Sequence, residues 1–217
     1  MRLALGQLNA TTGDFSGNGA RIEAFWKEAE AARADLLLVP ELAVCGYPPR
    51  DLLDRPSFQA ETARLVSQLA RRAGRTALLA GAFVPNPSKT GKPLFNAALL
   101  FRNGRVAAVA KKCLLPAYDV FEEVRHFEPG RRPTLARLAG RKVSLTICED
   151  LWNDKDFWRT RRLYRDDPGE ALLARGADLI VNVSASPFSE GKPRLRRRML
   201  ARLARDGGVP VAYLNLV

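Results

Sequence analysis

Short apolar runs alternate with helix-like stretches along this sequence, and that alternation restricts the fold more than any other feature. Strand-like runs occupy residues 2–8, 36–40, 76–83, 95–101, 105–112, 142–147, 178–184 and 209–216. An Asn103-Gly104 pair joins two of these runs with no helix between them, which is typical of a β-hairpin. Helices that alternate with strands, together with a hairpin, predict a layered α/β fold with mixed sheets.

Four segments have the spacing or composition of helices. The first is expected from Asn18 onward, because Gly13 and Gly17 before it are typical of a turn. The second is expected to be capped by Ser57 and to end before Gly74. The residues expected to be buried in these two helices are Ile22, Phe25, Ala29, Ala32, Phe58, Leu65 and Leu69. The remaining helices are expected over residues 168–177 and 192–205.

Composition indicates one globular domain over residues 1–217. The chain is 47% hydrophobic and 27% charged, which is enough apolar material for a large core. It has no long apolar run at its start and none of the roughly 18 residues that a membrane span needs, so we expect a cytoplasmic protein without a membrane partner. The sequence stops at Val217 in an apolar strand with no polar tail. We therefore expect the domain to be incomplete at its C-terminal end.

Cysteine and histidine content limits the chemistry that the chain can perform. Cys45, Cys113 and Cys148 form no CxxC pair, which favours reduced thiols over disulfides. His126 is the only histidine, so a metal site built from several histidines is excluded. We expect no metal ion and no cofactor in this chain. A reactive cysteine here would need a base other than histidine.

The formal charge of +12 comes mostly from arginine. The arginines gather at positions 159, 161, 162 and 165 and again at 194, 196, 197, 198, 202 and 205. Such clusters can bind nucleic acid, but these are not interleaved with the aromatic side chains that stack on bases. We favour solvated or subunit-facing helices and expect no nucleic-acid partner.

Three residues stand where predicted strands end, the place where α/β folds present functional groups. Cys148 follows the apolar run VSLTI, Glu41 follows LLLVP and Lys112 ends RVAAVAKK. Taken singly, each has an ordinary explanation: a buried structural thiol, a capping or solvated glutamate, and a surface lysine. Glu123 and Arg125 could likewise form an ordinary ion pair.

Taken together, three segments favour a functional explanation of these residues over the ordinary ones. PELAVCGYPPRDLL, KKCLLPAYDVFEEVRHFEPG and ICEDLW closely resemble, in order and spacing, the three signature blocks of the nitrilase superfamily. The stretches GQLNATTGDFSGN, GYPPRDLL and NVSASPFSEGK further resemble the amidotransferase domain of glutamine-dependent NAD synthetases. The resemblance covers essentially the whole chain and implies a nitrilase-like four-layer αββα sandwich.

The resemblance also assigns residues. It implies a catalytic set of Cys148 as nucleophile, Glu41 as general base and Lys112 as the cation beside the oxyanion, with Glu123 in support. The positions that it places around the glutamine substrate are Tyr47, Tyr118, Glu149, Trp152, Ser186 and Lys192. The function implied is that of the glutaminase half of the synthetase, which supplies ammonia for the amidation of deamido-NAD.

The same resemblance implies partners that lie outside this sequence. The family's ATP-dependent synthetase domain has a glycine-rich loop that this chain lacks, so ATP and Mg²⁺ would belong to that domain. Domains of this superfamily associate through helices beside the cysteine strand, and we therefore expect a homo-oligomer that uses residues 158–173.

Two other functions compete with this prediction. The chain could be a stand-alone amidase of the nitrilase family acting on another small amide, which would turn over aliphatic amides and leave glutamine unchanged. It could also be a non-catalytic binding or assembly module that uses its basic helices. Salt-dependent nucleic-acid binding with an unreactive Cys148 would favour that second alternative.

Overall fold

The computed structural model describes all 217 residues and contains two separate β-sheets. The first sheet has the strand order β1-β2-β3-β4-β5 and the second has the order β6-β7-β8-β9. The strands are β1 Leu3–Leu5, β2 Leu36–Leu38, β3 Ala77–Pro85, β4 Leu94–Arg102, β5 Arg105–Lys111, β6 Thr134–Leu138, β7 Arg141–Ile147, β8 Leu179–Ser184 and β9 Val211–Asn215. Each sheet contains parallel and antiparallel pairs, as predicted.

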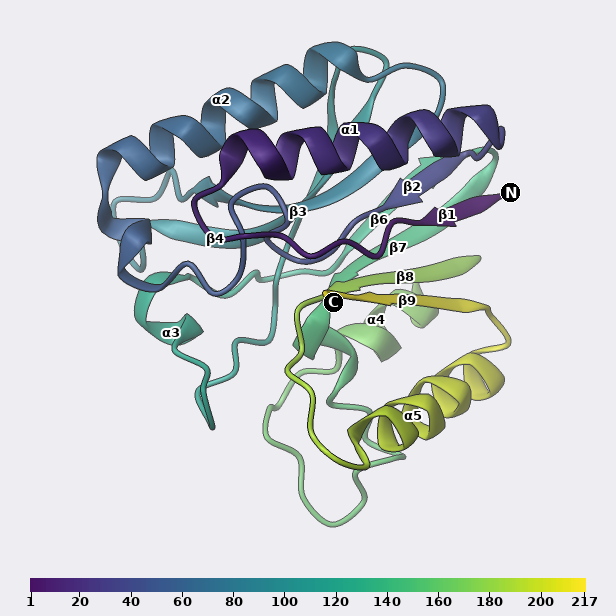
Figure 1. Ribbon diagram of the computed structural model, residues 1–217. Coiled ribbons are helices and arrows are strands. Elements are labelled where there is room, and N and C mark those ends of the chain that lie inside the picture. The colour runs from purple at the N-terminus through teal and green to yellow at the C-terminus, as the bar shows by residue number, and fades with distance from the viewer.

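Helices cover the outer face of each sheet. The helical elements are α1 Phe15–Ala31, η1 Arg50–Asp54, α2 Pro56–Arg72, α3 Glu123–His126, η2 Cys148–Leu151, α4 Pro168–Ala174 and α5 Lys192–Gly207. Figure 1 shows α1 and α2 over the first sheet, and α4 and α5 beside the second. The order helix, sheet, sheet, helix is the predicted four-layer αββα arrangement.

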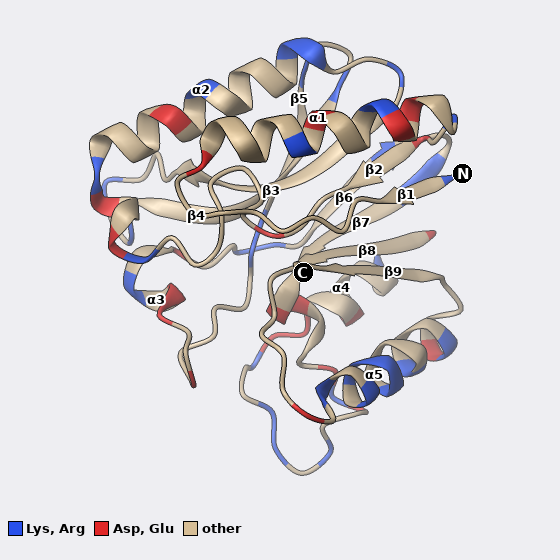
Figure 2. Cartoon of the chain, viewed as in Figure 1, with Lys and Arg blue, Asp and Glu red and all other residues tan.

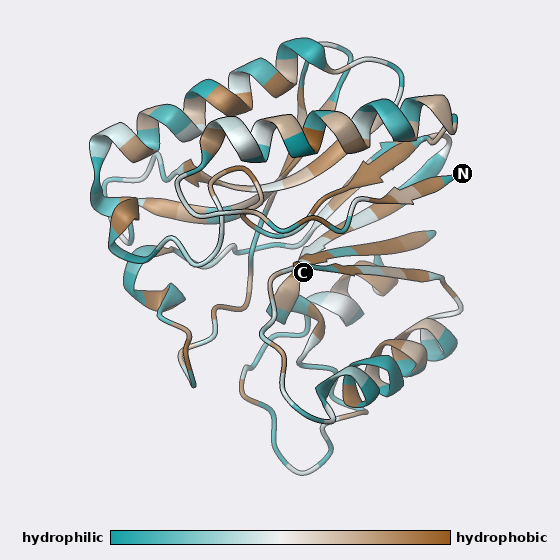
Figure 3. Cartoon of the chain, in the orientation of Figure 1, coloured by the Kyte–Doolittle hydropathy of each residue, from teal (hydrophilic) through white to brown (hydrophobic).

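Three apolar layers hold these elements together. One buried cluster joins α1 and α2 to the first sheet, a second fills the space between the two sheets, and a smaller one lies between the second sheet and α5. The strands are strongly apolar in Figure 3, while the exposed faces of the outer helices are hydrophilic. Burial of apolar area between layers is therefore the main stabilising term, as in other layered folds.

The predicted hairpin is confirmed. Arg102 at the end of β4 pairs with Arg105 at the start of β5, so Asn103 and Gly104 form a two-residue loop. Their φ angles are 52° and 75°, the left-handed conformation that a tight hairpin requires and that Asn and Gly adopt most readily.

Both predicted helix starts were wrong by a few residues. Helix α1 begins at Phe15, because the Asp14 carboxylate accepts a 2.8 Å hydrogen bond from the N–H of Gly17 and caps the helix there. Helix α2 begins at Pro56, which leaves Ser57 inside the first turn with Arg55 as the cap. Of the residues expected on the buried faces, Ile22, Ala29, Phe58, Leu65 and Leu69 are buried, Phe25 is half-buried, and Ala32 is exposed at the helix end.

The sequence did not predict β6. This strand pairs antiparallel with β7 through a tight loop in which Ala139 and Gly140 both have positive φ angles, 47° and 75°. Alanine rarely adopts that conformation, so the loop lacks the usual hairpin signature. The short helical elements η1 and α3 were also missed. No helix in the structure is both long and apolar enough to cross a membrane.

Candidate active site

Lys112 and Cys148 directly follow strands, Glu41 lies three residues after the end of β2, and all three side chains are buried. Glu41 comes after β2, Lys112 after β5 and Cys148 after β7, so the first two belong to one sheet and the cysteine to the other. Their exposed fractions are 1%, 0% and 2%. Functional groups from both sheets therefore meet beneath the surface, at the end of the sandwich where these strands finish.

Lys112 binds two carboxylates at once. Its Nζ lies 2.8 Å from Oε1 of Glu41 and 2.7 and 2.9 Å from the two oxygens of Glu123. Burial alone would lower the pKa of Lys112, but Glu123 and Glu41 outweigh it and raise that pKa well above the ordinary value. Lys112 is therefore a fixed cation at neutral pH.

Glu41 is held on both of its oxygens. Asn96 Nδ2 and Lys112 Nζ each donate to Oε1 at 2.8 Å, and the N–H of Ala185 donates to Oε2 at 2.9 Å. Asn96 also donates to Glu123 at 3.2 Å. Burial raises the pKa of Glu123, and Lys112 opposes that rise. These bonds fix the orientation of Glu41, which prepares a carboxylate for proton transfer.

Cys148 is the first residue of η2, at a sharp turn directly after β7. Its φ angle is 42°, a conformation that non-glycine residues seldom adopt and that is often found at functional sites. Burial raises the pKa of its thiol, Glu41 raises that pKa further, and Lys112 lowers it. The thiol is thus protonated at rest, so a nucleophilic role requires a base that removes the proton during attack.

A pocket of about 530 Å³ is lined in part by Glu149, the residue that directly follows Cys148. It brings together four of the residues assigned to the substrate by sequence: Tyr118, Glu149, Trp152 and Lys192. The buried Glu149 carboxylate accepts hydrogen bonds from the hydroxyl of Tyr118 at 2.9 and 3.0 Å. Lys192 Nζ lies 5.5 Å from the centre of the Trp152 ring, and burial lowers its pKa. The pocket therefore offers an anionic and a cationic group.

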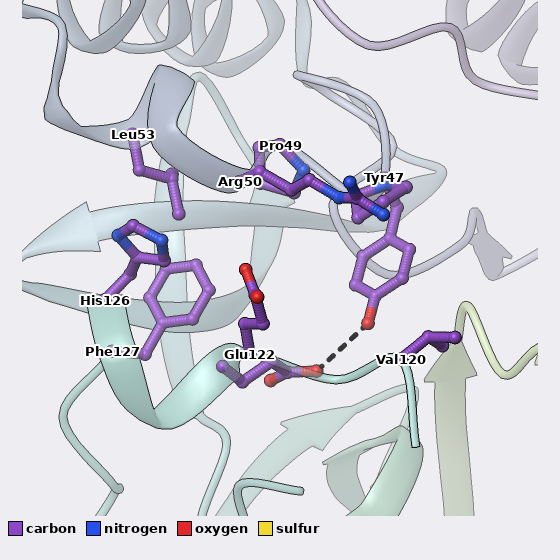
Figure 4. A pocket seen from close by; sticks show the side chains of 10 residues that line it. Tyr47, Pro49, Arg50, Leu53, Val120, Glu122, His126 and Phe127 are labelled. Atoms are coloured by element: carbon purple, nitrogen blue, oxygen red, sulfur yellow. Dashed lines mark hydrogen bonds between the residues drawn. The ribbon is translucent and has the colours of Figure 1, made fainter. Parts of the chain in front are cut away.

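The other two assigned substrate residues lie elsewhere. Tyr47 and Ser186 line a separate hollow near the end of β9. The Ser186 N–H is bonded to Asn215, and the Tyr47 hydroxyl donates to Glu123 at 3.3 Å. Tyr47 also borders the small pocket in Figure 4, where its hydroxyl makes the dashed bond. The structure thus places Tyr47 next to the lysine-carboxylate network.

Nearby titratable groups have other partners. Arg125 pairs with Asp51 at 3.3 Å, so the alternative of a Glu123–Arg125 ion pair was wrong. His126 lines the pocket of Figure 4, with its ring nitrogens 3.6 to 3.7 Å from Asp54 and Asp51. Cys45 and Cys113 have thiol pKa values raised by burial, and their thiols donate only to backbone carbonyl oxygens.

Sequence reasoning missed three residues of the site. Asn96 links Glu41 to Glu123, and its position as a polar residue inside the apolar run FNAALLF could have marked it. Tyr164 donates to Glu149 at 3.0 Å from a loop that the buried Asn153 amide holds in place. Asp150 accepts three backbone hydrogen bonds. Nothing in the local sequence distinguishes Tyr164.

Helix α5, which is rich in Lys and Arg, lies outside the hydrogen-bonded network of Lys112, Glu41 and Glu123. Figure 2 shows Lys and Arg concentrated along α5. Arg196 is the one that turns inward, with its guanidinium 4.9 Å from the Tyr213 ring and 6.0 Å from the Trp152 ring. The other arginines of α5 are mostly exposed, as expected for a solvated face.

Comparison with known proteins agrees with this geometry. The chain is 41% identical to a glutamine-dependent NAD(+) synthetase of Synechocystis over 99% of its own length, and 38% identical to that of Thermotoga maritima over all of it. It spans 39% and 35% of those two proteins. The glutamine-dependent NAD+ synthetase of Acinetobacter baumannii superposes with a TM-score of 0.87 at 28% identity, covering 99% of this chain and 38% of that one.

A second group of similar structures consists of amidases. An amidase from Nesterenkonia sp. AN1, solved with acrylamide added at its active-site cysteine, has a TM-score of 0.80 and 27% identity, and covers 100% of this chain and 78% of that one. The family model for carbon-nitrogen hydrolases matches residues 2–217. Because that match covers almost the whole sequence, the chain belongs to the carbon-nitrogen hydrolase family.

Proposed function

We propose that this chain hydrolyses glutamine to glutamate and ammonia, with Cys148 as nucleophile, Glu41 as general base and Lys112 as the oxyanion cation. The observation that carries the proposal is the buried network of Lys112 with Glu41 and Glu123, whose charges act on the buried Cys148 thiol. Such a network is costly to bury, and sites with this cost are commonly functional.

The side chains of Cys148, Glu41 and Lys112, with one backbone N–H group and water, suffice for the whole reaction. Glu41 takes the proton of the Cys148 thiol as the sulfur attacks the side-chain carboxamide carbon, and the carbonyl oxygen becomes an oxyanion. Lys112 and the backbone N–H of Glu149 stabilise that oxyanion. Glu41 then protonates the nitrogen, the C–N bond breaks and ammonia leaves a γ-glutamyl thioester. Water that Glu41 deprotonates attacks the thioester and releases glutamate and the thiol.

The pocket favours an amino acid over a simple amide. Glu149 is a buried carboxylate whose partners are neutral tyrosine hydroxyls, so it can accept the α-ammonium group of glutamine. Lys192 lies at the same pocket and suits the α-carboxylate, with Tyr118 and Trp152 as walls. Tyr47 and Ser186, which line a separate hollow, are not part of this pocket. An amidase for small aliphatic amides has no use for paired opposite charges, which makes it the weaker alternative.

The wider role follows from the relatives. We propose that residues 1–217 form the glutaminase domain of a glutamine-dependent NAD synthetase, and that the ammonia reaches a synthetase domain that uses ATP and Mg²⁺. We also propose a cytoplasmic protein and a homo-oligomer that associates through residues 158–173. The names of the relatives and their greater length support the first of these statements.

Two cysteine variants test the proposed reaction. We expect Cys148→Ala to lower glutamine hydrolysis by about 10³-fold or more, as loss of a catalytic nucleophile does, and Cys113→Ala to retain it. A diazo-ketone analogue of glutamine should label Cys148 and spare Cys45 and Cys113, as mapped by mass spectrometry. Turnover of propionamide with glutamine left intact would support the amidase instead. Full activity of Cys148→Ala would exclude the proposed nucleophile.

A further inference from the structure

A buried aspartate lies two residues after Cys148 and has no part in the mechanism above. Asp150 is 3% exposed. Its Oδ1 accepts hydrogen bonds from the N–H groups of Cys113 at 2.8 Å and Leu114 at 3.0 Å, and its Oδ2 accepts one from Ile147 at 3.0 Å. All three donors belong to the backbone, so the carboxylate holds main chain rather than other side chains.

The three donors come from the two segments that carry the reacting groups. Cys113 and Leu114 directly follow Lys112, which extends from the end of β5 in the first sheet. Ile147 is the last residue of β7 in the second sheet and directly precedes Cys148. A single rigid carboxylate therefore connects the backbone beside the lysine to the backbone beside the cysteine, across the junction between the sheets.

Capping of η2 does not account for this arrangement. A cap for that short helix needs only the bond from Ile147, which a neutral Asn or Ser could also accept. Asp150 instead keeps a full carboxylate in the interior, where burial raises its pKa to about 6 while the three backbone donors and Lys112 oppose that rise. A carboxyl group kept in the interior carries a cost in stability.

We propose that Asp150 is a positioning residue that fixes the separation between Lys112 and Cys148, and so aligns the oxyanion cation with the attacking sulfur. Rate depends steeply on such alignment, whereas the binding of glutamine depends on Glu149 and Lys192 in the adjoining pocket. The inference rests on the proposed glutaminase activity. If Asp150 has this positioning role, its loss lowers kcat and leaves substrate binding nearly unchanged.

The test compares Asp150→Asn with Asp178→Asn in the natural protein. Asp178 also accepts a backbone hydrogen bond from β7, from Lys142 at 2.7 Å, but at the opposite end of the strand from Cys148. In Asp150→Asn an amide NH₂ replaces one acceptor and faces a backbone N–H. We expect kcat for glutamine to fall roughly 10- to 100-fold with KM changed less than about threefold. Labelling of Cys148 by the diazo-ketone analogue should slow to the same extent, and Asp178→Asn should change neither quantity.

A second variant covers the case in which Asp150→Asn does not fold. Asp150→Glu keeps the charge and both acceptors but lengthens the side chain by one methylene, so the spacing changes while the charge does not, and the same loss of kcat is expected. A folded Asp150 variant with wild-type kcat, or one whose loss lies mainly in KM, would overturn the positioning role. If Cys148→Ala is inactive while Asp150→Asn is fully active, only the positioning role fails, and the glutaminase stands.

Discussion

At the scale of single residues, the site depends on one lysine that neutralises part of a buried acidic pair. Lys112 contacts Glu41 and Glu123 within 2.9 Å, and the three side chains are at most 5% exposed. The two acidic side chains share one cation, and Asn96 and the Ala185 N–H also donate hydrogen bonds to Glu41. Removal of the lysine would leave both carboxylates without a counter-ion.

We therefore expect Lys112→Met to destabilise the protein by about 3 to 5 kcal/mol, the usual cost of removing one partner from a buried ion pair. The matched control is Lys111→Met. Lys111 is only half-buried and contacts the Phe95 ring at 3.8 Å, an interaction of about 1 kcal/mol or less. Urea denaturation of both variants gives the two changes in the free energy of unfolding. Equal changes would mean that the network contributes nothing to stability.

At the scale of elements, a glycine in β3 sets the position of Glu41. The turn after β2 packs directly on this strand, and a Cβ built at Gly81 would lie 2.2 Å from the Leu42 nitrogen and 2.5 Å from the Glu41 Cα. Hydrogen bonds from the Gly81 N–H to Pro40 and from the Val44 N–H to the Gly81 carbonyl, both 3.1 Å long, fasten the turn. Only glycine permits this approach of two backbones.

Gly81→Ala should therefore displace the Glu41 turn, destabilise the protein by about 1 to 3 kcal/mol as overpacking does, and lower kcat. Gly74→Ala provides the control, because a Cβ at Gly74 meets no atom within 4 Å. Thermal unfolding and glutamine hydrolysis would be measured on both. A Gly81→Ala protein with wild-type stability and wild-type kcat would show that a side chain at position 81 does not disturb the Glu41 turn.

At the scale of the whole molecule, each of the two sheets carries part of the proposed catalytic set. The first sheet carries Glu41 and Lys112, and the second carries Cys148 and the neighbouring Glu149. The apolar layer between the sheets, which includes Leu38, Leu79, Leu145 and Val181, sets their spacing. The three side chains come together only when both sheets are packed, so the proposed activity requires both sheets rather than either one alone.

This chain is proposed to be the glutaminase of a complete synthetase, whose two activities a cysteine variant should separate. Cys148→Ala should abolish NAD formation from glutamine and leave formation from added ammonium salts largely intact, because the thiol is needed only to release ammonia. The measurement is NAD formed with each nitrogen donor in turn. Cys45→Ala, which removes a thiol outside the network, should preserve both activities. Parallel loss of both activities in a folded Cys148→Ala protein would contradict the division of labour.

The sequence by itself determined the strand-helix order, the Asn103-Gly104 hairpin and the family, because periodicity, turn residues and motif spacing are local properties of the chain. The start of α1 was missed although it is set locally by Asp14, a typical N-cap residue, because Gly13 and Gly17 favour a turn there. Strand β6 was missed because Ala139 has a positive φ angle, which alanine seldom adopts.

Only the tertiary structure decided which side chains meet. It placed Asn96 between Glu41 and Glu123, brought Tyr164 to Glu149, and paired Arg125 with Asp51. The physical reason is that these contacts join residues brought together by the packing of strands, helices and loops. Their distances depend on how the layers pack together, and no spacing along the chain encodes that.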